Sequence, residues 1–439
     1  MNAKDHKTRL NLSKKTVLFF NKGGAHTYLA MRIAEDVKRV MVYTPNKDSI
    51  YPHPRFDFIG FGLPGLEVVH SFTEAKKEVY AEGDNGGFVF PFSGDGDLQA
   101  ELRADGKRVF GSGAVEKLEM NRPLFKKTLM ERGLPTAPDK IFTGIEALRK
   151  LAREDPGWWI KYFGKDSTYR GAGETFFLDE YQKSASELNK RALVLGCLAE
   201  IWEFMGEKPL KGFETGSDRL FSGGKALSIG TWGYELKNLA YIARCTDVNK
   251  FPKMIRQVND AMSPVWAKFG LCGALSDETR IVKRQPYCVD LTPRFGSPPG
   301  EIISRLYKNI TEMIWCCAGG EDVTPEPIAK YAACVNIKCP DAANGDVPLE
   351  IKDKDMDKVL LKSACKIGGQ VFNIASPPED HDDEVATAIG FGSIIEEAQQ
   401  QCLENAELID SPGLWYPADC FDETEEILEK AEKAGLEKL

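Results

Sequence analysis

The opening of the chain follows a pattern that few folds accommodate. A short apolar run, Thr16 to Phe20, ends in the turn Asn21-Lys22-Gly23-Gly24, and a helical pattern and a second apolar run, Arg39 to Tyr43, follow it. Strand, glycine turn, helix and strand in this order are typical of a βαβ unit, whose two strands are parallel. The sequence therefore predicts an α/β fold that begins with a parallel sheet.

Two more apolar runs extend this opening pattern. Phe88 to Phe90 and Lys107 to Phe110 are strand candidates, and the helical stretch Leu98 to Ala104 lies between them. Alternation of strands and helices favours further parallel pairing. We expect an amino-terminal parallel α/β domain over residues 1–115.

Length and composition exclude several classes of protein. A chain of 439 residues normally divides into about two to four domains. The 66 acidic side chains outnumber the 57 basic ones, which argues against a nucleic-acid partner. The 11 cysteines form no CxxC pair and no run of about 18 uncharged apolar residues occurs, so we expect reduced thiols and no membrane partner. The predicted location is cytoplasmic.

A second unit follows a proline-marked connection. Pro135 and Pro138 come after the helical pattern Pro123 to Arg132. We place a central domain at 116–325, with a small lid at about 140–205.

The lid contains the elements of a phosphate-covering flap. After a helix at Ile145 to Arg153, strand Trp158 to Lys161, the glycine loop Gly164 to Gly173 and strand Glu174 to Leu178 follow in order. We also interpret the apolar run Leu193 to Met205 as a strand.

The rest of the central domain ends in a hairpin. A helix is predicted for Phe251 to Phe269, and strands are predicted for Leu271 to Thr279 and Pro286 to Leu291. Residues 326–439 form a third, α+β domain in this interpretation. It has strand candidates at Val359 to Leu361, Gln370 to Ile374 and Thr387 to Phe391, and helices at Ile394 to Asn405 and Glu423 to Leu436.

Four pieces of the chain suit a polyphosphate and a divalent metal. These are Arg122, Lys161, the glycine loop, and the run Asp290-Leu291-Thr292-Pro293-Arg294. Cations and backbone amides bind phosphate oxygens, and carboxylates bind the metals that bridge those oxygens.

The predicted hairpin places two acids side by side. Glu278 lies near the end of the first strand and Asp290 on the returning one. Two carboxylates that face each other repel, and a cation relieves this repulsion. Strand parity alone leaves open whether Asp277 or Glu278 is the first metal ligand.

An ordered series of motifs resembles glycinamide ribonucleotide synthetase (phosphoribosylamine-glycine ligase), of the ATP-grasp superfamily, from about Val17 to about Asp422. The closest piece is Asp290-Leu291-Thr292-Pro293-Arg294-Phe295-Gly296-Ser297-Pro298, which is similar to the family's Glu-Phe-Asn-x-Arg-Phe-Gly-Asp-Pro. The other matching runs are Asn21 to His26, Gly111 to Arg122, Gly133 to Ala137, Trp159 to Lys161, Glu203 to Met205 and Gly390 to Gln399.

The resemblance implies an ATP-dependent ligase that works through an acyl phosphate, with Mg²⁺, or Mn²⁺ in its place, as the metal. It implies small-molecule substrates, namely an amino-acid carboxylate and a nucleotide-like amine, and a place in purine biosynthesis. The protein would be a monomer or a homodimer. The residues that inherit roles are Arg294 and Lys161 as catalytic groups; Arg122, Lys161, Lys165, Arg170, Glu203, Phe204, Met205, Glu207 and Glu214 at the nucleotide; Glu278, Asp290 and Thr292 at the metal; and Gly23, Gly24, Thr231, Trp232, Gly233, Tyr234 and Arg294 at the substrates.

Some of these roles are specific. The backbone of Glu203 to Met205 would read adenine, and either Glu207 or Glu214 would accept the ribose hydroxyls. Lys165 and Arg170 of the glycine loop would contact phosphate.

Two departures from the family pattern bear on function. Asp290-x-Thr292 replaces Glu-x-Asn at the metal, and Ser228 to Glu235, with the bulky Trp232, replaces an acceptor-site loop. The second departure raises the alternative of a divergent ligase with another nucleotide or amine as acceptor. The first raises the alternative of an inactive nucleotide-binding scaffold. The pair Trp158-Trp159 could indicate base stacking in a nucleic-acid-binding protein, but we interpret it as core packing.

Overall fold

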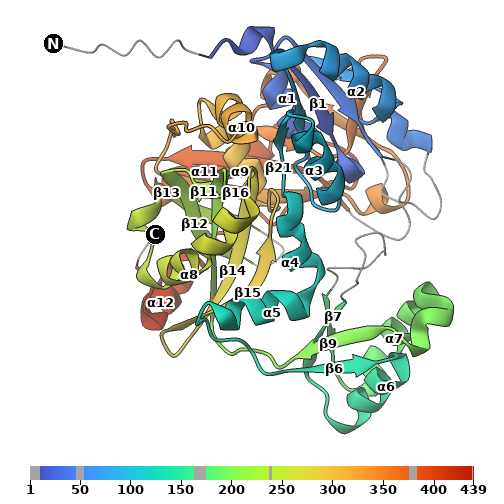
Figure 1. Cartoon of the computed structure of the whole chain (residues 1–439), viewed down its shortest axis with the longest axis vertical. Helices are drawn as coiled ribbons and strands as arrows, with labels where there is room; N and C mark the ends of the chain where they lie inside the picture. The colour runs from blue at the N-terminus through green and yellow to red at the C-terminus, as the bar shows by residue number, and fades with distance from the viewer. Residues whose placement is uncertain (1–9, 46–53, 163–174, 237–239, 375–382, 438) are drawn as a thin grey trace.

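The computed structural model describes residues 10–45, 54–162, 175–236, 240–374, 383–437 and 439. It is an α/β protein with one parallel sheet and several antiparallel ones. The parallel sheet has the strand order β3-β2-β1-β4-β5, and it forms the upper part of Figure 1. Its elements are β1 (Thr16–Phe20), α1 (Thr27–Ala34), β2 (Arg39–Tyr43), β3 (Leu66–Val68), α2 (Phe72–Ala81), β4 (Gly86–Val89), α3 (Gly96–Ala104) and β5 (Arg108–Phe110).

A nine-stranded antiparallel sheet forms the middle of the molecule. Its order is β15-β14-β10-β12-β13-β16-β21-β18, and the short β11 pairs with β10. The pairing of β13 with β16 joins strands from before and after residue 325 in one sheet. The strands are β10 (Phe213–Ser222), β11 (Lys225–Ala226), β12 (Ile229–Leu236), β13 (Ala240–Asp247), β14 (Ala274–Val282), β15 (Gln285–Thr292), β16 (Tyr331–Lys338), β18 (Val359–Leu361) and β21 (Glu384–Gly392).

A small four-stranded sheet makes the lid, at the lower right of Figure 1. Its order is β6-β9-β7-β8, and α6 and α7 cover one of its faces. The elements are β6 (Asp139–Thr143), α6 (Ile145–Glu154), β7 (Trp158–Tyr162), β8 (Thr175–Leu178), α7 (Tyr181–Leu195) and β9 (Glu203–Glu207). The helices α4 (Glu116–Met120) and α5 (Arg122–Glu131) precede the lid, and α8 (Lys253–Phe269) follows it.

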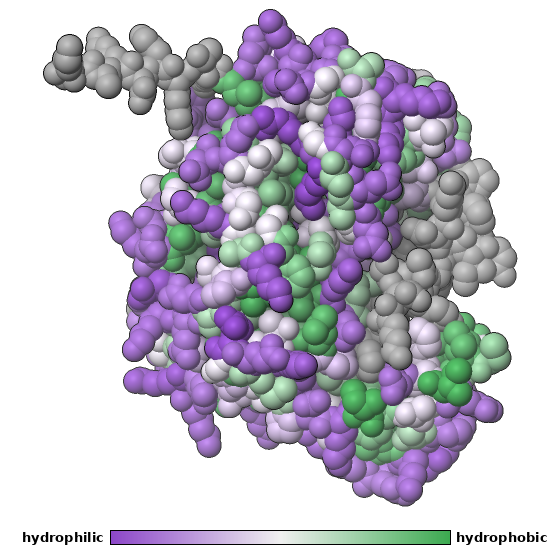
Figure 2. Space-filling view, viewed as in Figure 1, coloured by the Kyte–Doolittle hydropathy of each residue, from purple (hydrophilic) through white to green (hydrophobic). Residues whose placement is uncertain are grey.

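The strand predicted for Leu193 to Met205 is wrong. Most of that run is the end of α7 and a short 3₁₀ turn, and only its last residues enter β9. Leu193 and Val194 are 83% and 56% exposed at the end of the helix, so their apolar character does not mark a buried strand. Figure 2 shows apolar surface on the lid.

The remaining helices and strands belong to the carboxy-terminal part of the chain. Helices α9 and α10 belong to a core that also contains residues of the parallel sheet and of β13 and β16, so they join the two sheets. Neither helix is predicted from the sequence. The elements are α9 (Pro299–Leu306), α10 (Ile310–Ala318), β17 (Val347–Ile351), β19 (Ala364–Ile367), β20 (Gln370–Asn373), α11 (Ile395–Ala406), β22 (Ile409–Asp410) and α12 (Thr424–Ala434), with β19-β20-β17-β22 as a fourth sheet.

Among the helices of the described residues, none combines the length and the apolar character that a membrane span requires.

Candidate functional site

The hairpin of β14 and β15 carries the predicted metal ligands. Glu278 lies directly opposite Asp290, and Ser276 lies opposite Thr292. Opposite residues of an antiparallel pair share one face of the sheet, so Glu278, Asp290 and Thr292 lie on the same side. The predicted neighbourhood of the two acids is present in the structure.

Asp277 lies on the other face of the same hairpin, because successive side chains of a strand alternate. Its carboxylate accepts hydrogen bonds from Ser217 Oγ at 2.6 Å and from Arg219 Nη2 at 2.9 Å. Both charged side chains of this ion pair are buried. Of the two acids that strand parity left open, Glu278 therefore shares the face of Asp290, and Asp277 is held inside the protein.

Arg122 reaches this hairpin from the first turn of α5. Its guanidinium forms an ion pair with the Asp290 carboxylate, and the Arg122 side chain is buried. Partial burial favours the neutral acid, but the charges of Arg122 and Lys161 outweigh it and hold the pKa of Asp290 below its usual range. Asp290 is therefore a carboxylate at neutral pH.

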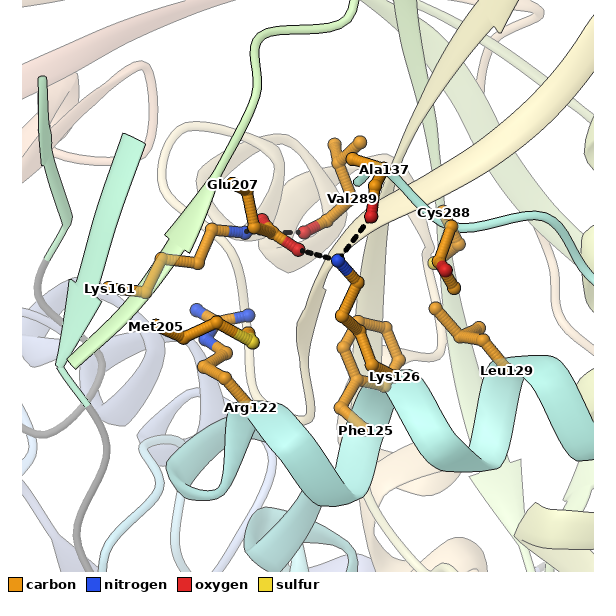
Figure 3. Close-up of a pocket in the computed structure, with 11 residues that line it drawn as sticks. Arg122, Phe125, Lys126, Leu129, Ala137, Lys161, Met205, Glu207, Cys288 and Val289 are labelled. Carbon is orange, nitrogen blue, oxygen red and sulfur yellow. Dashed lines mark hydrogen bonds and ion pairs between the residues drawn. The ribbon is translucent and has the colours of Figure 1, made fainter. Parts of the chain in front are cut away.

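Lys161 points from β7 of the lid toward the same hairpin. Its ammonium donates to the Val289 carbonyl at 3.0 Å and forms an ion pair with Glu207 at 2.8 Å. Lys126 of α5 forms a second ion pair with Glu207, at 2.9 Å, and donates to the Ala137 carbonyl. Figure 3 shows the two ammonium groups pointing at the Glu207 carboxylate in a pocket between α5, the lid and β15.

Lys126 is a site residue that sequence reasoning missed. It follows Arg122 by four positions, and residues four apart lie on one face of a helix. This spacing was the available signal. The side chain is buried and also lies 2.9 Å from Asp139, so three acceptors surround its ammonium.

The residues of the predicted adenine hinge lie within the lid sheet. Glu203, Phe204 and Met205 belong to β9, whose central residues pair with β6 on one side and β7 on the other. The sheet thus uses the backbone groups that would have read adenine, and the Phe204 side chain lies in the lid core. Residues 208–212 connect β9 to β10 of the large sheet.

Both candidate ribose acids are paired with cations. Glu207 binds Lys126 and Lys161, and Glu214 binds Arg280 through an ion pair on neighbouring strands. Burial disfavours the charge of Glu207, but its two lysines hold its pKa below the usual range. Glu207 lines the pocket of Figure 3, whereas Glu214 does not.

Arg294 lies in the loop that follows β15. Its Nε lies 3.5 Å from Glu119 Oε1, and its guanidinium carbon lies 4.5 Å from the centre of the Phe92 ring. The side chain is 23% exposed, so part of the guanidinium faces solvent beside the hairpin.

The four predicted substrate residues of the central domain lie inside the protein. Thr231, Trp232, Gly233 and Tyr234 are part of β12, which pairs with β10 and β13. Trp232 and Tyr234 are each 1% exposed and belong to a hydrophobic core. They form no acceptor loop, because the run is a central strand.

The first glycine turn contacts the carboxy-terminal part. Ser363 donates from its backbone N–H to the Gly24 carbonyl at 2.9 Å and from Oγ to the Gly23 carbonyl at 3.0 Å. Gly23 and Gly24 both have positive φ, and a Cβ on Gly24 would lie 2.6 Å from Ser363 Oγ.

His26 follows the turn. Burial, and next the nearby Arg294, lower the pKa of His26 to about 3, so this imidazole is neutral.

Asp218 is a second residue that the sequence did not single out. It lies opposite Ser276 and accepts hydrogen bonds from Ser276 Oγ and, at 3.1 Å, from Tyr241. Burial raises its pKa to about 7, and the charge of Asp277 adds to this shift. Ser276 also lies against Gly296, so its hydrogen bond to Asp218 connects this acid to the loop that carries Arg294.

The predicted phosphate contacts Lys165 and Arg170 lie outside the described residues.

Trp158 is buried as expected, but Trp159 is 38% exposed and contacts the exposed ring of Phe177 at 5.1 Å between ring centres. Trp159 shares a sheet face with Lys161, so core packing describes only the first of the two tryptophans.

The donor set fits magnesium. The described residues contain no group of three or more His, Cys, Asp and Glu side chains that could hold a metal. Mg²⁺ does not need such a cage, because it is usually bound by one or two carboxylates together with substrate phosphates and water. Glu278 and Asp290 on one face, with the Thr292 hydroxyl, are a suitable set of oxygen ligands.

The fold is that of the ATP-grasp enzymes. A phosphoribosylamine-glycine ligase from Thermotoga maritima is similar at a TM-score of 0.65 and 18% identity, over 92% of this chain and 99% of that one. The biotin carboxylase domain of the 2-oxoglutarate carboxylase from Hydrogenobacter thermophilus, solved with MgADP and bicarbonate, is similar at 0.62 and 12%, over 94% and 98%. An N5-carboxyaminoimidazole ribonucleotide synthetase from Thermotoga maritima is similar at 0.56 and 13%, over 92% and 100%. No protein-family model and no curated protein matches the sequence.

Proposed function

We propose that the protein is an ATP-dependent ligase that joins a carboxylate to an amine and releases ADP and phosphate. The observation that carries the proposal is the charged group at the hairpin, where Arg122 pairs with Asp290 and Lys161 lies close enough to lower the pKa of that acid. A metal-bound nucleoside triphosphate requires cations for its phosphate oxygens and carboxylates for its metal, and both are present here. The fold shared with a phosphoribosylamine-glycine ligase and with a biotin carboxylase domain solved with MgADP supports the same class of reaction.

The proposed reaction has two steps. The donor carboxylate attacks the γ-phosphorus of ATP, the bond to the β,γ-bridging oxygen breaks, and ADP leaves. The amine then attacks the carbonyl carbon of the acyl phosphate, loses a proton and displaces inorganic phosphate. Amide formation is thus driven by the phosphoryl transfer.

The cations of the site would act on charge. Lys161, Arg122 and Arg294 would neutralise the oxygens of the transferring phosphoryl group, which is the main contribution a protein makes to phosphoryl transfer. Mg²⁺ bound by Glu278, Asp290 and Thr292 would neutralise further phosphate oxygens; Mn²⁺ prefers the same oxygen ligands. Lys126 would join the phosphate-binding group, since it shares Glu207 with Lys161.

The nucleotide base is placed next to the pocket in this proposal. The connection 208–212 would contact adenine through its backbone, and Glu207 rather than Glu214 would lie near the ribose, because only Glu207 lines the pocket. Binding would require the carboxylate to exchange one of its two lysine partners.

Glycine and phosphoribosylamine are the first substrates to test. The similarity to the phosphoribosylamine-glycine ligase supports glycinamide ribonucleotide synthesis, a purine-biosynthesis reaction, as the specific proposal. A ligase with another nucleotide or amine as acceptor is the alternative. Trp232 no longer supports that alternative, because its side chain lies in the core.

The test is ADP release from MgATP with a panel of substrates. Glycine and other amino acids serve as carboxylate donors, and phosphoribosylamine, nucleotides or no amine serve as acceptors. Release that needs glycine and phosphoribosylamine together identifies the specific reaction, and release with another pair identifies the alternative. Nucleotide binding without release for any pair would overturn the ligase in favour of an inactive scaffold, which Asp290-x-Thr292 keeps as the second candidate.

A further inference from the structure

The guanidinium of Arg294 is held by residues outside its own loop. Phe92, which follows β4 of the parallel sheet, contacts it through its ring, and Glu119 of α4 faces its Nε at 3.5 Å. Within its own loop, Arg294 makes one hydrogen bond, from Nη1 to the Phe295 carbonyl at 3.5 Å. The placement of Arg294 therefore depends on two segments that precede it by more than 170 positions.

Glu119 is a buried acid at the centre of the charged site. Ser93 Oγ donates to Glu119 Oε2 at 2.8 Å, and this bond ties α4 to the loop after β4. Burial raises the pKa of Glu119, while Arg294, Ser93 and Arg122 favour its charged form. A buried carboxylate is costly unless it is paired, so Arg294 and Glu119 stabilise each other.

A long side chain on a loop needs such support. Arginine has about 2 kcal/mol of rotamer entropy, and a catalytic cation is effective only when it is already in place as charge develops. The Phe92 ring lies against the guanidinium carbon, and the Glu119 carboxylate forms an ion pair at the Nε edge. The Arg294 side chain is 23% exposed, so part of the guanidinium still faces solvent.

We propose that Glu119 is a positioning residue, which together with Phe92 orients Arg294 toward the γ-phosphoryl group. The inference rests on the proposed function, which assigns Arg294 to that group. The inference adds that a loop of the parallel sheet helps to position Arg294, since Phe92 and Ser93 both belong to the loop after β4.

The chain offers a matched control on the same helix. Glu116 lies three positions before Glu119 and is also buried. Its carboxylate accepts hydrogen bonds from the backbone N–H groups of Gly94 and Gly96, both at 2.8 Å, and from Ser112. Glu116 thus holds the neighbouring loop through contacts that do not involve Arg294.

The test compares the dissociation constants of MgADP and of magnesium adenylyl imidodiphosphate, measured by titration calorimetry on the full chain. The dissociation constant of MgADP divided by that of the triphosphate analogue reports the contacts to the γ-phosphate. We expect R294A to reduce this ratio at least tenfold, E119Q to reduce it at least fivefold with MgADP affinity kept within twofold, and E116Q to leave it unchanged. R294A/E119Q should equal R294A alone, because both changes act through one side chain.

Several results would overturn the inference. An unchanged ratio for E119Q, when R294A reduces it, shows that Arg294 is placed without Glu119. Additive losses in the double variant show that Glu119 acts independently. Thermal unfolding shows whether E119Q is folded; if it is not, F92L replaces it, and an unchanged ratio in F92L contradicts the shared support. Failure of wild-type protein to bind MgADP, or an unchanged ratio in R294A, contradicts the proposed function instead.

Discussion

Arg122 and Asp290 are 168 positions apart, yet their side chains form an ion pair at the centre of the candidate site. The pair joins the first turn of α5 to the end of β15. Arg122 is almost completely buried, whereas Asp290 keeps a third of its side chain exposed. The carboxylate is thus held on one side by the cation and open on the other, where a metal and a phosphate would bind.

Replacing Asp290 by Asn removes the negative charge of this ion pair. We expect the magnesium concentration for half-maximal ATP binding to rise at least tenfold, because one of two carboxylate ligands is lost and Arg122 is left as a buried charge. The measurement is a magnesium titration of ATP binding. D277N is the control: its carboxylate lies on the other face of β14, so it should lower the free energy of unfolding without changing the magnesium requirement. Equal magnesium titrations for wild type and D290N would assign the metal to other ligands.

Lys161 should be needed for turnover. K161A is expected to slow ADP release a hundredfold or more, which corresponds to a loss of about 2.7 to 4 kcal/mol, as for other single charge-stabilising groups. Lys140 provides the control, since it is a lysine of the same small sheet that contacts the ring of Trp158. K140A should keep ADP release within twofold of wild type. Similar rates in K161A and K140A would remove Lys161 from the site.

Asp218 should make stability depend on pH. Its pKa is about 7 in the folded protein, against an ordinary value of 3.8, so the folded state binds a proton more tightly than the unfolded state does. The free energy of unfolding therefore falls as pH rises from about 4 to 7 and levels off above 7. At about 1.4 kcal/mol per pKa unit, the change is at most on the order of 4 kcal/mol.

The D218N variant lacks this titration. Urea unfolding at pH 5, 6, 7 and 8 should show D218N becoming steadily more stable relative to wild type up to pH 7. The exposed Asp260 of α8 supplies the control, and D260N should follow the wild-type profile. Parallel profiles for wild type and D218N would mean that the acid does not titrate in this range.

Trp232 should matter for stability and not for the acceptor. W232A empties a large core position, and loss of a buried aromatic side chain costs about 3 to 5 kcal/mol. W232F retains most of the packing and should lose less. The Michaelis constant for the amine should stay within twofold in W232F. A tenfold change in that constant in a stable W232F protein would restore Trp232 to the acceptor site.

Local patterns predicted the elements whose burial is regular. The boundaries of β1, β2 and β18 agree with the apolar runs, and the β14–β15 hairpin has the register that places Glu278 beside Asp290. Alternation in a hairpin is a property of neighbouring residues, so the sequence contains it. The choice between Asp277 and Glu278 depended on which face Arg219 occupies, and that is set by pairing between distant strands.

Other features depend on contacts that no local pattern records. The apolar end of α7 resembles a strand because Leu193 and Val194 are apolar and exposed. Trp232 was assigned to a pocket because its motif aligns with a loop, whereas pairing with β10 and β13 makes the segment a central strand. Lys126 and Glu119 gain their roles only when α4, α5, the lid and β15 come together.

The pairing of β13 with β16 has a consequence for how the chain can be divided. A fragment that ended at residue 325 would keep β13 but lose its neighbour, and a row of backbone N–H and C=O groups would become an open sheet edge. Such an edge promotes aggregation, so the two parts are not independent folding units. Truncation at this point would produce insoluble protein, whereas removal of α12 would leave every strand of the large sheet with its partners.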